Sequence, residues 1–173
     1  MTEPADQLTP PKPTQSLTGF YVGLGVVAAL FLLGVWLRTP AKIVYWEWQA
    51  RRGGDEPMTQ VRREAVFNLL WEVRQPAQPT LNRLLHSPHR GFRREVALFL
   101  YWQSQEAAKD RLPEEQYWPL VLFIENLQNN DPEVAHWALA SAKELLCRDF
   151  TDSRALLDWW EREGKAKYGE DKK

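Results

Sequence analysis

The residues of this sequence that could carry chemistry are three histidines, one cysteine and a scatter of carboxylates. His86 and His89 are three residues apart, which could bring two imidazoles to one metal ion, but Pro88 interrupts the helix that would align them. His136 lies much farther along the chain, and Cys147 follows two leucines, where a free thiol usually packs as a small apolar group. The sequence therefore predicts no catalytic residue, no metal ligand and no bound cofactor.

The motifs that would signal a catalytic site are also missing from the sequence. It contains no Gly-rich phosphate loop, no HExxH and no GxSxG, and Arg52-Gly53-Gly54-Asp55 fits a linker turn better than a P-loop. Cys147 is the one cysteine, so an intrachain disulfide and a disulfide-stapled secreted fold are excluded. We therefore expect a protein that is not an enzyme.

A long uncharged run near the N-terminus predicts a transmembrane helix. Residues 17–37, LTGFYVGLGVVAALFLLGVWL, are 21 residues without a charge, which span about 31 Å as a helix and match the hydrocarbon thickness of a bilayer. A cleaved signal peptide would begin with basic residues and end in small ones, whereas Trp36, Leu37 and Arg38 stand at the end of this run. A buried core helix is the other alternative, although aromatic residues at both ends of the run suit membrane interfaces.

The charges flanking this run predict its orientation. Four basic residues follow it within fifteen positions and one precedes it, Lys12, so the positive-inside rule places the N-terminus outside and the C-terminal part in the cytoplasm. Two small-xxx-small pairs within the run could mediate a helix–helix contact in the membrane. These pairs are Gly19 with Gly23 and Gly25 with Ala29.

The remaining sequence divides into a helical domain with irregular flanks. Residues 1–16 hold four prolines and residues 165–173 are mostly charged, so both are predicted to be disordered tails. Residues 38–56 are predicted to be a juxtamembrane linker, and residues 57–164 show apolar side chains at intervals of three and four, which indicates helices. The aromatic residues at 43–50 could either lie along the headgroup layer or pack on the domain.

Caps and prolines predict six helices in this domain. The first has the apolar stripe Val61, Ala65, Leu69 and Val73, and the second begins at Pro79. The later starts are a Ser87 cap with Pro88, then Pro119, an Asp131 cap with Pro132, and a cap at Asp152 or Ser153. Each long helix precedes a shorter one, which indicates a helical hairpin used three times.

The three hairpins carry similar residues at their starts. Val61-Arg62-Arg63-Glu64-Ala65 matches Phe92-Arg93-Arg94-Glu95-Val96, and Val134 begins the corresponding stretch of the third, so Val61, Phe92 and Val134 are predicted to be equivalent and buried. Residues 79–98 and the start Asp131-Pro132-Glu133-Val134 resemble HEAT-type repeats, and the Trp159-Trp160 end is similar to the ends of some bacterial HEAT arrays. The fold expected is all-α: one transmembrane helix followed by a short solenoid of about three HEAT-like hairpins. An irregular three-hairpin bundle is the alternative.

Charge is divided unevenly along the sequence. Residues 38–94 carry eleven basic and five acidic side chains, net +6, whereas residues 95–173 carry ten basic and sixteen acidic, net −6. A basic strip could contact anionic lipid or an acidic partner, or its arginines could simply be solvated helix residues paired with Glu64 and Glu95. The strip candidates are Arg51, Arg52, Arg62, Arg63, Arg93 and Arg94. Nucleic acid is not expected as a partner.

These features favour a non-catalytic, membrane-anchored helical-repeat adaptor or accessory subunit of a membrane complex that binds a protein partner. We expect the partner to meet Trp118, Trp137 or Trp159, at least one of which is predicted to be exposed. The HEAT resemblance also implies an alternative, a bilin-lyase-like enzyme or chromophore-handling protein. A third hypothesis is a sensor of anionic lipid surfaces.

Overall fold

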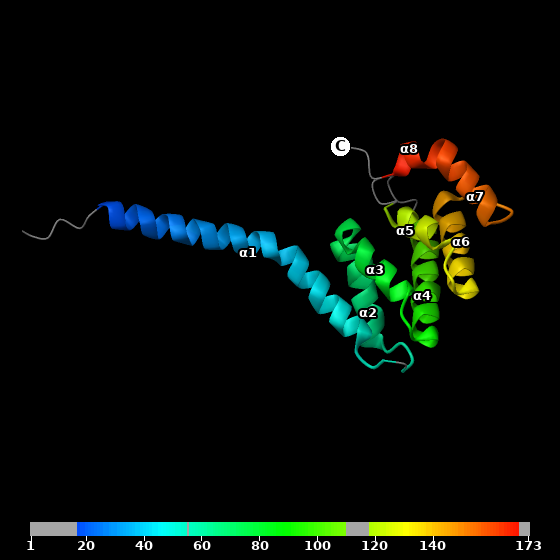
Figure 1. Ribbon diagram of the computed structural model, residues 1–173, viewed down its shortest axis with the longest axis horizontal. Helices are drawn as coiled ribbons and strands as arrows, with labels where there is room; N and C mark the ends of the chain where they lie inside the picture. Colours follow the sequence, from blue (N-terminus) through cyan, green and yellow to red (C-terminus); the bar gives the residue numbers. More distant parts are fainter. Residues whose placement is uncertain (1–16, 55, 110–117, 170–173) are drawn as a thin grey trace, which may run out of the picture. The chain divides into compact units, whose positions relative to one another are not determined.

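The computed structural model describes residues 17–54, 56–109 and 118–169, and within these ranges all regular structure is helical. The expected all-α fold is therefore confirmed, with one apolar N-terminal helix followed by packed helices (Figure 1). The predicted tail at 1–16 and the end of the predicted tail at 165–173 lie outside the described residues. The chain divides into two units, residues 1–38 and 39–173, and each is described by itself.

The first unit contains most of the apolar part of helix α1 (Leu17–Arg51). Its apolar side chains face solvent, with 68% of Phe31, 66% of Leu32 and 64% of Val27 exposed. Among the described residues, one helix is long and apolar enough to cross a membrane, and none of its apolar window is buried. Ala29 is exposed on it, whereas Gly19, Gly23 and Gly25 lie outside the residues whose side chains are described.

The segment predicted to be a linker, residues 38–56, is helical as far as Arg51, because α1 continues past Pro40. A turn follows in which Gly53 and Gly54 have φ angles of 106° and 56°, conformations that other residues adopt only with strain. The turn leads into α2 (Gln60–Asn68). Thr59 is the N-cap of this helix, and its side chain accepts a hydrogen bond from the Arg62 amide.

The helices of the second unit follow one another in three pairs along the sequence, which we call the first, second and third hairpins. The first pairs α2 and its π-helical extension Leu69–Val73 with α3 (Gln78–Leu85), after a short 3-10 turn at Gln75–Ala77. The second pairs α4 (Arg90–Lys109) with α5 (Pro119–Asn126), and the third pairs α6 (Pro132–Leu146) with α7 (Ser153–Trp159). A π-helical stretch, Trp160–Gly164, and α8 (Lys165–Tyr168) follow.

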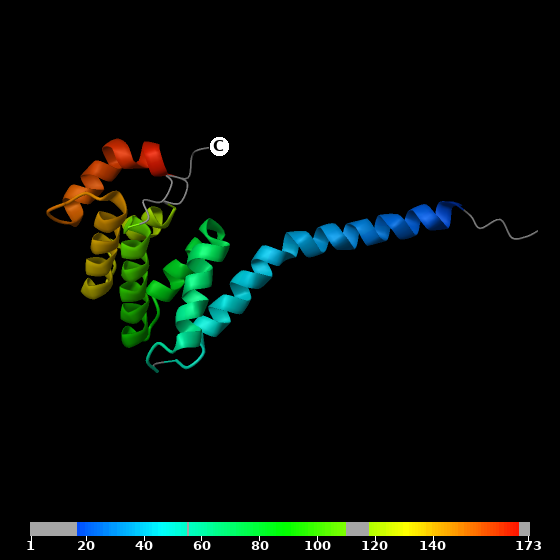
Figure 2. The same cartoon turned by 180° about the vertical axis from the view of Figure 1, so that it is seen from behind.

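These hairpins pack side by side in a repeat-like manner. Helix α4 lies between the first hairpin and α6 in both views (Figures 1 and 2), and its most extensive packing is against α6. Leucine is the commonest residue of the described core, and it suits close helix packing because it fills space without a polar group. Its fully buried members include Leu69, Leu81, Leu84, Leu100, Leu122 and Leu156.

The predicted helix caps are confirmed at two positions. Asp131 accepts a hydrogen bond of 3.1 Å from the Glu133 amide, and Asp152 accepts one of 2.9 Å from the Ala155 amide. The predicted Ser87 cap is wrong, because α4 begins at Arg90 and the Ser87 hydroxyl instead accepts from the His89 amide at 3.4 Å. Ser87 and Pro88 therefore belong to the turn before the helix.

The predicted repeat register is wrong by one residue in the first hairpin. Phe92 and Val134 are 2% and 1% exposed, as predicted, but Val61 is 53% exposed and Arg62 is 2% exposed. The inward side chains Arg62, Phe92 and Val134 are each followed four residues later by another buried side chain. The Arg-Arg-Glu sequence that the first two hairpins share does not reveal this register, because the first hairpin has an arginine at the inward position where the others have an apolar residue.

The C-terminal segment is ordered farther than the sequence predicts, since Lys165–Tyr168 forms α8. Gly164 makes this possible by letting the chain pass close to two indoles. A Cβ atom at Gly164 would lie 2.6 Å from Trp160 Cε3 and 2.8 Å from Trp159 Cζ3, which is shorter than any normal contact. The ring of Tyr168 then packs 6.3 Å from that of Trp159.

We predict that Phe92→Ala lowers the free energy of unfolding by about 3–5 kcal/mol, because it opens a cavity under a fully buried side chain. Val61→Ala is the matched control and should change it by less than about 0.5 kcal/mol, since Val61 is exposed. Unfolding of the detergent-solubilised chain, followed by near-UV circular dichroism of the tryptophans, measures both. Equal effects of the two substitutions would contradict the corrected register.

Candidate functional site

Arg62, one of the predicted lipid contacts, is instead a buried structural side chain. Its guanidinium donates to three backbone carbonyls: Ala50 at 2.9 Å, Glu56 at 2.5 Å and Gly54 at 3.0 Å. It also lies 4.2 Å from the centre of the Phe92 ring. Desolvation by burial lowers the pKa of Arg62, while the nearby charges of Glu95 and Glu56 act to raise it. Arg62 is therefore not available to a membrane or a partner.

Arg93 and Arg94, also predicted as contacts, both bind the buried carboxylate of Asp131. Their Nε atoms lie 2.8 Å and 3.0 Å from Asp131 Oδ2, and Arg94 also pairs with Glu133 at 2.7 Å. Asp131 is 3% exposed and caps α6, so this cluster joins the start of α4 to the start of α6. The pKa of Asp131 is lowered to about 2, and the main cause is the hydrogen bond from Arg94. Hydrogen bonds from the Glu133 amide and from Arg93 contribute as well.

The three remaining arginines of the predicted strip are exposed. Arg51 pairs with Glu47 at 3.1 Å, and Arg52 lies 5.3 Å from the centre of the Trp48 ring. Arg63 is exposed on α2. The six arginines therefore do not form one basic strip, because half of them hold the helices together.

The prediction that Trp118, Trp137 or Trp159 would be exposed is wrong. Trp159 is 8% exposed and belongs to the core, and the other two are half-buried against it. The Trp137 ring packs 5.0 Å from Tyr101, and the Trp159 Nε1 donates to Glu163 at 3.0 Å. These tryptophans adjoin core residues in sequence, and their large rings turn towards the core rather than to solvent.

Two aromatic side chains outside the predicted partner contacts are exposed on the domain. Phe67 on α2 is 43% exposed and Trp102 on α4 is 47% exposed. A hydrogen bond of 3.1 Å between Trp71 Nε1 and Gln103 Oε1 links the π-helical extension of α2 to α4. Phe67 and Trp102 both lie outside the three- and four-residue spacing of the buried side chains on their helices, and this spacing is the sequence signal that could have predicted their exposure.

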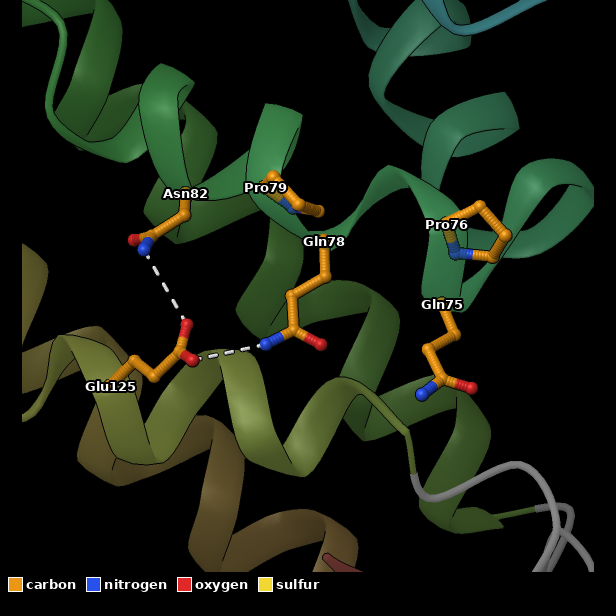
Figure 3. Close-up of a pocket in the computed structure, with 6 residues that line it drawn as sticks. All are labelled: Gln75, Pro76, Gln78, Pro79, Asn82 and Glu125. Carbon is orange, nitrogen blue, oxygen red and sulfur yellow. Dashed lines mark hydrogen bonds between the residues drawn. The ribbon is translucent and has the colours of Figure 1, made fainter. Parts of the chain in front are cut away.

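A cleft of about 580 Å³ lies between α3, with the turn before it, and α5 (Figure 3). The described residues that line it have polar side chains, apart from two prolines. The lining residues are Gln75, Pro76, Gln78, Pro79, Asn82 and Glu125. The proline-started second helix of the first hairpin thus faces the second helix of the next hairpin across the cleft.

Carboxamides orient Glu125, the one carboxylate among the described residues of this cleft. Gln78 Nε2 donates to Glu125 Oε1 at 3.1 Å, and Asn82 Nδ2 lies 3.4 Å from Glu125 Oε2 (Figure 3). Behind them, Asn126 Nδ2 donates to Asn82 Oδ1 at 2.9 Å, and Asn129 Nδ2 donates to Asn126 Oδ1 at 2.9 Å. An amide ladder therefore runs along the α3–α5 boundary and fixes the side chains that face the cleft.

The arrangement suits hydrogen bonding to a ligand. Among the described residues, no Lys or Arg side chain forms an ion pair with Glu125, so its carboxylate retains acceptor capacity for a cation or an N–H group. Among the described residues that line the cleft there is neither a histidine nor a cysteine. His136 instead packs against Trp137, and Cys147 is exposed at the left-handed C-cap of α6. Within the described ranges no three His, Cys, Asp or Glu side chains gather at metal-binding distance.

Comparison with known proteins adds no family to this description. No family model matches the chain, and neither a curated protein nor a solved structure matches it.

We predict that acid destabilises this fold partly through Asp131. Its folded-state pKa of about 2 lies below the ordinary value of 3.8, so its contribution is present above pH 3.8 and is lost as the pH falls towards 2. Asp131→Asn keeps a capping side chain but removes the charge. The variant should be less stable at neutral pH and should lose less stability than the wild type between pH 4 and pH 2. Parallel acid limbs in denaturant unfolding of the two proteins would contradict this assignment.

Proposed function

We propose that this protein is a non-catalytic, membrane-anchored adaptor or accessory subunit of a membrane complex, whose HEAT-like hairpins bind a protein partner at the cleft between α3 and α5. The single observation that carries the proposal is the apolar helix in which Val26 to Val35 expose their large side chains, because an exposed run of this length is not compatible with water. It favours an anchor that confines the helical domain to a membrane surface.

The repeat packing supports the HEAT-like part of the proposal. Three successive hairpins place an inward side chain at equivalent positions of their first helices, and α3 and α5 begin with or beside a proline. Stacked hairpins present the second helices of neighbouring units along one surface. A partner that lies along this surface would contact α3 and α5 together.

The cleft supports a peptide segment as the bound group. Carboxamides can both donate to and accept from a peptide backbone, and Gln75 and Gln78 border the same cleft as Glu125. The Glu125 carboxylate favours a basic side chain in the bound segment, since opposite charges attract and an Arg guanidinium pairs well with a carboxylate. The partner is therefore expected to present an extended segment with an arginine or lysine.

We predict that the protein resists extraction from membranes by alkaline carbonate, because about 21 uncharged residues span the bilayer core. A tag at the C-terminus should be protected from protease in spheroplasts or sealed vesicles of native orientation, as the positive-inside rule requires. A tag at the N-terminus is the matched control and should be cleaved. Release of the protein by carbonate would contradict the anchor. Cleavage of the C-terminal tag alone would show that the orientation is opposite to the predicted one.

We predict that Glu125→Lys abolishes capture of the partner when the tagged protein is purified from solubilised membranes, because it replaces the acceptor by a repelling cation. Gln78→Ala should weaken capture several-fold, since it removes a donor that orients Glu125. Trp102→Ala is the control, as it removes an exposed side chain of α4 that is not among the described residues of the cleft. Mass spectrometry of the captured proteins measures all three. Loss of the partner with Trp102→Ala and its retention with Glu125→Lys would place the partner on α2 and α4 instead.

A further inference from the structure

The part of α1 that belongs to the second unit is apolar on two opposite faces. One face packs on the domain through Ile43 and Trp46, and Ala50 is completely buried there. The other face is exposed and follows the helical spacing of three and four residues. We call it the outer stripe; its residues are Ala41, Val44, Tyr45 and Trp48, together with Arg52 directly after the end of α1.

The outer stripe exposes large apolar groups to an unusual degree. Val44 is 68% exposed, Trp48 is 55% exposed and Tyr45 is 48% exposed. A helix that is apolar on one face needs one apolar neighbour, and a helix that is apolar on two faces needs two. The domain supplies the first neighbour. The second must come from outside the described chain.

We propose that the outer stripe lies in the headgroup layer of an anionic membrane. This inference rests on the proposed membrane anchor and adds a second attachment, at the surface of the bilayer. The stripe would hold the first turns of the domain against the membrane, so that the domain is positioned by two contacts rather than by a tether alone.

The composition of the outer stripe favours lipid over a protein surface. Trp and Tyr are enriched at bilayer interfaces because their rings have an apolar body and a polar edge. The Arg52 guanidinium lies 5.3 Å from the centre of the Trp48 ring, so the stripe presents a cation beside an aromatic ring. This combination complements lipid phosphates above acyl chains.

Chain length keeps the outer stripe within reach of the bilayer. Trp48 follows Leu37, the last residue of the predicted span, by eleven positions, which correspond to about 16 Å of helix. Lys42 and Arg51, the neighbouring basic residues, pair with Glu72 and Glu47. Arg52 therefore supplies the positive charge of the stripe itself.

The test uses the full chain in nanodiscs of neutral phosphatidylcholine, or of the same lipid mixed with anionic phosphatidylglycerol. In a Cys147→Ser background, Val44→Cys carries an environment-sensitive fluorophore, and Trp102→Cys carries the same fluorophore as the control at an exposed site on α4. We expect blue-shifted emission at position 44, with quenching by spin-labelled lipids that is several-fold stronger than at position 102 and stronger in anionic nanodiscs. Adding Trp48→Glu should remove this quenching, whereas adding Phe67→Glu should leave it unchanged.

The outcomes separate this inference from the anchor. If the chain does not remain with the nanodiscs, the anchor proposal fails and this inference fails with it. If the chain remains and position 44 is quenched no more than position 102, the anchor stands and the stripe is not a membrane contact. If position 44 is blue-shifted but not quenched by the lipids, a protein surface covers the stripe and the inference is overturned.

Discussion

The fold of the domain depends on the buried guanidinium of Arg62. This guanidinium donates to the Ala50 carbonyl at the end of α1 and to the Gly54 and Glu56 carbonyls after the helix. It also lies on the Phe92 ring of α4. These contacts join the end of the N-terminal helix to the first two hairpins. A charge buried in this way is stabilising only while its hydrogen bonds are complete, so the glycine turn and the two helices form one interdependent unit.

The same use of charge continues at the next boundary. Arg93 and Arg94 meet at Asp131, which also caps α6, so that one carboxylate fixes the starts of two long helices. Half of the paired arginines, Arg62, Arg93 and Arg94, thus connect helices within the domain. The groups left for interaction are of a different kind: carboxamides around Glu125 in the cleft, and the aromatic outer stripe on α1.

These two surfaces lie on different elements and suit different partners. The cleft is polar, with a carboxylate held by neutral amide donors, and therefore suits a basic, extended protein segment. The outer stripe combines exposed Val, Tyr and Trp side chains with Arg52 and therefore suits the lipid interface. Separate surfaces for a membrane and a partner would allow a protein with the proposed adaptor function to hold both at once.

The sequence by itself determined the helical class, the uncharged run of residues 17–37 and the caps at Asp131 and Asp152, because periodicity, length and capping chemistry are local properties. It did not determine which side of a helix an arginine occupies. Arg62 lies inward in place of Val61 because carbonyls of the preceding turn and the ring of Phe92, thirty residues farther along the chain, complete the guanidinium's contacts. The cleft around Glu125 likewise arises only when α3 and α5, more than forty residues apart, pack together. Such long-range contacts are decided by the tertiary structure, since no local pattern specifies which side chains meet.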